Sequence, residues 1–166
     1  VSQLTSDVKN HYIEGFTHHG NREIKIPLIS HIEGNLWQGG CIDGVSLGNE
    51  FEHVISLYPW ERYKTTNMLN SFLEVKLYDS RDMPDRAKIE QIADWINLCA
   101  AQGPTLVHCQ AGLNRSSLVA AVALMRRDPA RSPEDVVALL REKRTDTVLC
   151  NRTFESWVLA YREGTV

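Results

Sequence analysis

The stretch VHCQAGLNRSS, residues 107–117, places a cysteine directly after an apolar run and an arginine six residues further on. The wholly apolar run PTLVHC before the loop is typical of a strand that is buried on both faces of a sheet. SSLVAAVALMRR, residues 116–127, is rich in Ala and Leu and predicts a helix directly after the loop. Inward-facing peptide N–H groups and the positive end of a helix bind a tetrahedral dianion. The stretch therefore predicts a phosphate-binding loop in an α/β fold.

Two side chains of this loop carry the predicted chemistry. The N–H dipoles, the helix terminus and the guanidinium of Arg115 all favour the thiolate form of Cys109. Arg115 suits a phosphoryl group because its planar fork holds two oxygens at once. Gly112 lets the backbone turn without a Cβ in the anion space, and we expect Asn114 to adopt the left-handed conformation. The predicted phosphate-binding residues, through the loop backbone and the Arg115 side chain, are Gln110, Ala111, Gly112, Leu113, Asn114 and Arg115.

The remaining chain reads as strands followed by helices. Short strands are expected in residues 34–40, 52–58 and 71–78, so that three strands precede the first strong helix. That helix should span residues 84–101 and end at Gly103-Pro104. A helix in residues 132–144 should begin at the N-cap Ser132 with Pro133 at its first position, and a last helix should occupy residues 152–163. This order predicts an α/β domain with helices packed on a central sheet.

The composition of the chain restricts where the protein is expected to be located and what it is expected to bind. A formal net charge of −3 and a pI near 6.1 give no electrostatic footprint for nucleic acid or an anionic membrane. We expect no membrane span and no signal peptide, and hence a cytoplasmic protein. The four cysteines are widely spaced and are expected to be reduced. No metal is expected, because these histidines lack metal-ligand spacing: His11, His18, His19, His31 and His53.

The segment HCQAGLNRSS resembles the HCxxGxxRS signature of the cysteine-dependent protein tyrosine phosphatases, and specifically of the dual-specificity phosphatases. The resemblance covers residues 36–161. It implies a central, mostly parallel sheet flanked by helices, and hydrolysis through a phosphocysteine without metal or other cofactor. Residues 31–166 would form the catalytic domain and residues 1–30 an N-terminal extension packed on or flanking it. Further similar segments are NLWQGG, VKLYDS, PTLVHC and LCNRTFESWVLAY.

The resemblance also implies a general acid and two supporting groups. Of the three acids in LYDSRDMPD, Asp79 is preferred because it follows a strand and precedes Cys109 by 109 − 79 = 30 residues, close to the family's spacing. Asp82 is the alternative, and Asp85 is the third candidate. Ser116 is placed to donate a hydrogen bond to the thiolate, or to cap the helix, or both. His108 is expected to order the loop and not to act as a base.

The implied substrates are phosphotyrosine and phosphoserine or phosphothreonine in proteins. We expect the protein to be a monomer that binds neither nucleic acid nor membrane. The alternatives are an RNA 5′-triphosphatase, a phosphoinositide phosphatase and a pseudophosphatase that binds phosphorylated partners without turnover. Tyr58 or Trp60 could line the pocket and Arg62 could contact a phosphorylated partner, although aromatic clusters are more often core. Cys41 is read as a buried free thiol, with a disulfide to Cys109 under oxidation as the alternative.

Overall fold

The computed structural model describes residues 6–17, 21–65, 68–164 and 166. A five-stranded sheet runs through its centre in the order β3-β4-β9-β6-β8. Only the pair β3–β4 is antiparallel, and the other neighbours are parallel. The predicted α/β class with a mostly parallel sheet is therefore confirmed. The strand bounds are β3 Ile29–Glu33, β4 Leu36–Gly39, β6 His53–Ser56, β8 Ser71–Glu74 and β9 Thr105–His108.

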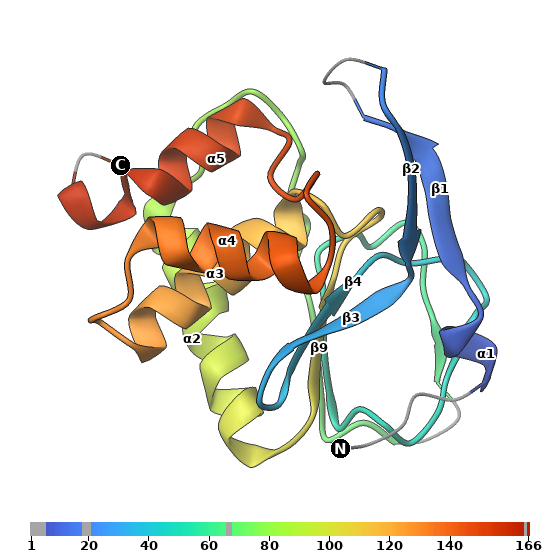
Figure 1. Cartoon of the computed structure of the whole chain (residues 1–166). Helices are drawn as coiled ribbons and strands as arrows, with labels where there is room; N and C mark the ends of the chain where they lie inside the picture. Colours follow the sequence, from blue (N-terminus) through green and yellow to red (C-terminus); the bar gives the residue numbers. More distant parts are fainter. Residues whose placement is uncertain (1–5, 18–20, 66–67, 165) are drawn as a thin grey trace.

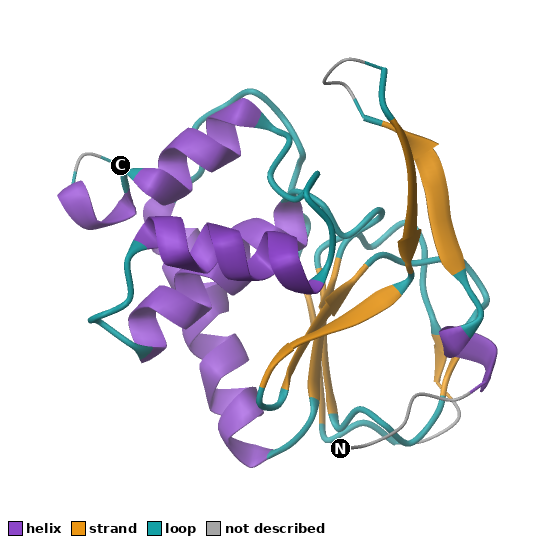
Figure 2. Cartoon of the chain, in the orientation of Figure 1, coloured by secondary structure: helices purple, strands orange, loops and turns teal. Residues whose placement is uncertain are grey.

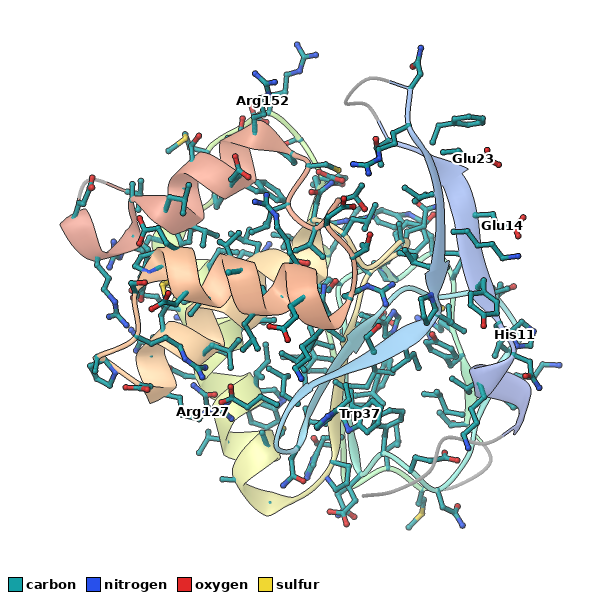
Figure 3. All side chains as sticks on the ribbon, viewed as in Figure 1. His11, Glu14, Glu23, Trp37, Arg127 and Arg152 are labelled. Atoms are coloured by element: carbon teal, nitrogen blue, oxygen red, sulfur yellow. The ribbon has the colours of Figure 1, made fainter. Side chains whose placement is uncertain are left out.

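Four helices cover one face of the sheet (Figures 1 and 2). Alternate residues of the strands point to opposite faces, so Val107 joins the core under the helices while its neighbour Leu106 joins a second core. The second core lies on the other face and includes Trp37, which Figure 3 labels. The helices are α2 Arg86–Gln102, α3 Arg115–Arg127, α4 Pro133–Lys143 and α5 Arg152–Leu159.

Local capping signals set the helix ends. The Asp85 carboxylate accepts from the N–H groups of Ala87 and Lys88 at the start of α2, and the Ser132 hydroxyl accepts from Asp135 N–H at the start of α4. The α4 start agrees with the sequence prediction, whereas α2 begins two residues after the predicted start at residue 84. The single helix predicted for residues 152–163 is wrong, because α5 ends at Leu159 and a short 3₁₀ turn, Tyr161–Glu163, follows it.

The N-terminal region is more ordered than its sequence suggests. After a short helix, α1 (Ser6–Lys9), the strands β1 (Tyr12–Phe16) and β2 (Glu23–Pro27) form an antiparallel hairpin. Glu14, Glu23 and His11 lie on its outer side (Figure 3). The expectation of three strands before the first long helix is wrong: the hairpin, β3 and the two-residue strands β5 (Ser46–Leu47) and β7 (Lys64–Thr65) also precede it.

The hairpin packs against the predicted phosphate loop. Ile24 and Ile26 point inward from β2 and form a small apolar cluster with Leu113 of the loop. Their alternation with exposed Glu23 and Lys25 gives β2 one apolar and one polar face. The hairpin therefore supports the loop from the side opposite the helices. The division at residue 31 into an extension and a catalytic domain stays a prediction.

Candidate functional site

The loop between β9 and α3 holds Cys109 at its base. This cysteine is 2% exposed. Its Sγ accepts a hydrogen bond from the N–H of Gly112 at 3.3 Å and lies 3.3 Å from the Ser116 hydroxyl. Both contacts favour a negatively charged sulfur.

The carbonyl groups of the loop are bonded to the surrounding scaffold. Gln110 O accepts from Cys41 N–H at 2.8 Å, and Leu113 O accepts from Leu149 N–H at 2.8 Å. In the described part of the chain, the N–H groups of Gln110, Ala111 and Leu113 have no backbone partner. Carbonyls turned outward leave the opposite side of the peptides to their N–H groups, which makes the loop suited to an anion.

Arg144 is a member of this site that the sequence prediction missed. Its guanidinium is buried and donates to Gly112 O at 2.7 Å, Ala111 O at 3.0 Å and Pro27 O at 2.9 Å. It thereby ties two loop carbonyls to the residue that ends β2. Burial lowers the pKa of Arg144 to about 10, so the side chain is still cationic at neutral pH. From the sequence, Arg144 was interpreted only as a basic residue at the end of a helix.

The backbone of the loop depends on one glycine. Gly112 has φ +70°, as its predicted role requires, and a Cβ there would lie 2.4 Å from the carbonyl carbon of Gly39. The expectation of a left-handed Asn114 is wrong. Asn114 has φ −113° and is the N-cap residue of α3, because the helix begins at Arg115, one residue earlier than predicted.

Arg115 is buried at the first position of α3. Its Nη1 donates to Leu77 O at 3.3 Å, and its guanidinium carbon lies 5.0 Å from the centre of the Tyr58 ring. Within the described residues, the buried Nε has no hydrogen-bond partner. A buried N–H donor without a partner is costly, and a phosphoryl oxygen is a suitable acceptor for it.

Of the three acids weighed in the sequence, Asp79 is the one hydrogen-bonded to the loop. Its Oδ2 accepts from the Asn114 amide at 2.9 Å, and its Oδ1 accepts from the Asn151 amide at 2.7 Å. The Asp85 carboxylate instead caps α2. The backbone N–H of Asp82 donates to Ser80 Oγ, which holds the intervening turn. Asn151 was not among the predicted site residues.

His108 is buried beside the cysteine. Its Nδ1 lies 3.3 Å from Cys109 O, and its ring packs edge-on against Tyr63 at 5.1 Å between centroids. Burial lowers the pKa of His108 to about 4, so the imidazole is neutral at physiological pH. A neutral ring bonded to the backbone suits a role in ordering the loop.

We predict that this buried histidine makes the stability of the protein fall on mild acidification. Between pH 6.5 and pH 4 an unfolded histidine binds a proton and the folded His108 does not. The free energy of unfolding should therefore fall by about 1.4 kcal/mol per pH unit across that window. Urea unfolding at pH 7 and pH 5.5 measures this, and His108→Gln should remove about 1 kcal/mol of the difference. An equal pH dependence in both proteins would contradict the assignment.

The structure also shows the surroundings of Cys41, Arg62 and Trp60, the further residues considered in the sequence. Cys41 is buried and free, as predicted, and burial raises the pKa of its thiol to about 12. A protonated thiol attacks poorly, so the disulfide with Cys109 stays an untested alternative. Arg62 forms an ion pair with Glu74 at 3.0 Å and stays largely exposed, so its contact with a phosphorylated partner stays a prediction. Trp60 is half exposed, 5.0 Å from the Tyr58 ring.

The histidines with described side-chain bonds have structural partners. His31 Nε2 lies 2.7 Å from Gly34 O, and His53 Nδ1 lies 2.6 Å from Ser71 Oγ. His18 and His19 lie outside the described residues. Over the part of the chain that the structure describes, no three His, Cys, Asp or Glu side chains are grouped to hold a metal. None of the described helices combines the length and the apolar character needed to cross a bilayer.

Comparison with known proteins finds similarity to dual specificity phosphatases. Residues 43–164 match the family described as "Dual specificity phosphatase, catalytic domain". The dual specificity protein phosphatase OPG106 of vaccinia virus (strain Copenhagen) is 24% identical over 110 residues, covering 64% of this chain and 64% of the viral protein. The chain thus matches less than two thirds of the length of this curated relative.

Solved structures share the fold at low identity. Human DUSP28 superposes with a TM-score of 0.67 and 17% identity, covering 82% of this chain and 94% of that one. The human tyrosine phosphatase-like serine/threonine/tyrosine-interacting protein gives a TM-score of 0.65 and 16% identity, with coverage of 81% and 95%. At these sequence identities the similarity shows a shared fold alone.

Proposed function

The chain belongs to the dual specificity phosphatase catalytic domain family, and from that premise we propose that it is a metal-independent phosphomonoester hydrolase with Cys109 as nucleophile. Its proposed substrates are phosphotyrosine and phosphoserine or phosphothreonine in proteins. The observation that carries the proposal is the loop itself: outward-bonded carbonyls, a buried sulfur that accepts an N–H bond, and an Arg115 Nε without a partner.

In the first proposed step the phosphoryl group moves to sulfur. The Cys109 thiolate attacks phosphorus in line with the leaving oxygen, and the S–P bond forms as the P–O bond breaks. The loop N–H groups and Arg115 hold the phosphoryl oxygens, where they stabilise the charge of the transition state. Asp79 gives its proton to the leaving oxygen. Its bond to Asn114, directly before Arg115, supports this choice over Asp82.

In the second proposed step water releases phosphate. Asp79, now a carboxylate, takes a proton from the attacking water, whose oxygen bonds to phosphorus. The S–P bond breaks and its electron pair returns to Cys109 as a thiolate. The Ser116 hydroxyl, 3.3 Å from Sγ, is close enough to donate to that thiolate and make it a better leaving group.

Three aromatic side chains favour a protein substrate. Tyr58, whose ring lies under the Arg115 guanidinium, contacts Trp60, and Trp60 lies 6.0 Å from Tyr78 between centroids. Trp60 and Tyr78 are 51% and 60% exposed, and Lys76 Nζ lies over both rings at 5.2 Å and 5.4 Å from their centres, so this patch offers apolar surface and a cation to a side chain that carries the phosphate. The variable loop positions are uncharged and offer no cation to a second phosphate of an inositol lipid. Cytoplasmic location and a monomeric state stay predictions.

The test is phosphate release in EDTA and reductant from para-nitrophenyl phosphate, phosphotyrosine and phosphothreonine peptides, an inositol phosphate and a triphosphorylated RNA end. We expect metal-free release that is fastest from the peptides among the biological substrates. Faster release from the RNA end or the inositol phosphate would instead identify that substrate class. No release from any of them, with phosphopeptide binding retained, would identify a pseudophosphatase.

A further inference from the structure

Gln38 is a fully buried polar residue in the centre of the sheet. It lies on β4, which runs beside β9 (Figure 1), and its Cα pairs with that of Val107, two residues before Cys109. Its side chain extends toward the start of α3, which follows the phosphate loop. A buried amide without hydrogen-bond partners costs free energy, so the partners of Gln38 indicate what this side chain does.

The partners of Gln38 are all in or directly after the loop. Its Nε2 lies 3.2 Å from Gly112 O, 3.0 Å from Ser116 Oγ and 2.5 Å from Ser117 Oγ. Its Oε1 has no partner among the described residues. A single amide group therefore spans the turn of the loop and the first turn of the helix.

The carbonyl of Gly112 fixes which way the amide faces. A carbonyl oxygen can only accept, so the atom of Gln38 that faces it must be the donor Nε2. The reverse orientation would press two acceptors together in the core. In the observed orientation the two N–H groups of Gln38 are shared among three acceptors, Gly112 O, Ser116 Oγ and Ser117 Oγ, and Ser116 Oγ lies 3.0 Å from Nε2.

This orientation constrains the hydroxyl proton of Ser116. Ser116 is fully buried, and its oxygen accepts from Gln38 on one side. Its other hydrogen-bond contact is Cys109 Sγ at 3.3 Å. A hydroxyl that accepts from an amide is a better donor, because neighbouring hydrogen bonds polarise one another.

We propose that Gln38 is a positioning residue that turns the Ser116 hydroxyl proton toward Cys109 Sγ and thereby speeds hydrolysis of the phosphocysteine. This inference rests on the proposed function. When the S–P bond breaks, its electron pair goes to sulfur, and the Ser116 O–H stabilises the new thiolate without transferring its proton. Gln38 touches neither substrate nor sulfur and acts through Ser116.

The test is a double-mutant cycle with Gln38→Met and Ser116→Ala, in which methionine has a similar volume but no donor. Stopped-flow mixing with para-nitrophenyl phosphate separates the burst of nitrophenolate, which reports phosphorylation of Cys109, from the later steady rate of hydrolysis. We expect each single substitution to slow hydrolysis about tenfold and to leave a clear burst. In the Ser116→Ala background, Gln38→Met should change hydrolysis by less than about twofold, because its effect requires the hydroxyl.

Asn97→Leu is the matched control. It removes a side-chain amide that is partly buried and donates to Ala123 O of α3 at 2.9 Å. It should lower stability without changing the ratio of hydrolysis to phosphorylation. Equal slowing by Gln38→Met with and without Ser116, or no slowing at all, would overturn the inference. A wild-type protein that releases no nitrophenolate would instead overturn the proposed function, so the two failures are distinguishable.

Discussion

We expect replacement of Cys109 by serine to abolish turnover while phosphopeptide binding persists. A serine hydroxyl in this loop is a far weaker nucleophile than a thiolate, because it stays protonated without an adjacent general base. The neighbouring His108 is bonded to the backbone and buried, so it does not supply that base. Activity on para-nitrophenyl phosphate should fall to the level of a blank reaction.

Binding should survive this substitution because the anion contacts come from other atoms. The loop carbonyls remain bonded outward and Arg115 is unchanged. The dissociation constant for a phosphotyrosine peptide, measured by calorimetry, should stay within about tenfold of wild type. Cys99→Ser is the matched control: Cys99 is also buried and free, lies on α2 beside Ser71, and should keep full activity when replaced. Residual turnover by Cys109→Ser, or loss of phosphopeptide binding, would contradict this account.

Replacing Asp79 by alanine should lower kcat/KM steeply for phosphotyrosine and much less for a substrate with a good leaving group. Protonation by a positioned acid contributes about 10²- to 10⁴-fold, and that factor is needed when the leaving oxygen is basic. A stable leaving anion departs without the proton. The ratio of kcat/KM for a phosphotyrosine peptide to kcat/KM for para-nitrophenyl phosphate measures this, because kcat/KM reports the steps up to phosphorylation of Cys109 and not the later hydrolysis, in which Asp79 also takes part.

Asp82→Ala is the control for Asp79, because both carboxylates lie in the same exposed loop. It should leave both rates near wild type. Equal losses on the two substrates in Asp79→Ala would remove the acid role, since a positional defect slows both reactions alike. A larger leaving-group dependence in Asp82→Ala would assign the acid to Asp82.

The elements that the sequence predicted are those with local signals. The body of α2 follows from its apolar periodicity, the α4 start from Ser132 and Pro133, and the buried strand β9 from Leu106 and Val107 just before the loop. Each of these elements is decided by residues within a few positions of one another. The need for glycine at position 112 was predicted, but the reason differs: a Cβ there would meet the backbone of Gly39 and the guanidinium of Arg144, not the anion.

The features that the sequence did not predict depend on distant partners. Arg144 was missed because its acceptors at residues 27, 111 and 112 come together only in the folded chain. Gln38 was overlooked inside an apolar strand, although a polar residue at such a position is itself a signal of a buried hydrogen-bond network. The hairpin was missed because its apolar face is covered by Leu113, almost ninety residues from Ile24.

Phosphate should pass through Cys109 on its way to water, and trapping the phosphocysteine shows whether it does. Ser116→Ala protein, whose hydrolysis step should be slow, is mixed with a phosphotyrosine peptide in EDTA and quenched in acid within the burst, and its peptides are sequenced by mass spectrometry. We predict phosphate on Cys109 and on no other cysteine, in an amount that approaches one per active molecule. Turnover of the peptide with no phosphate on Cys109 at any quench time would contradict the account.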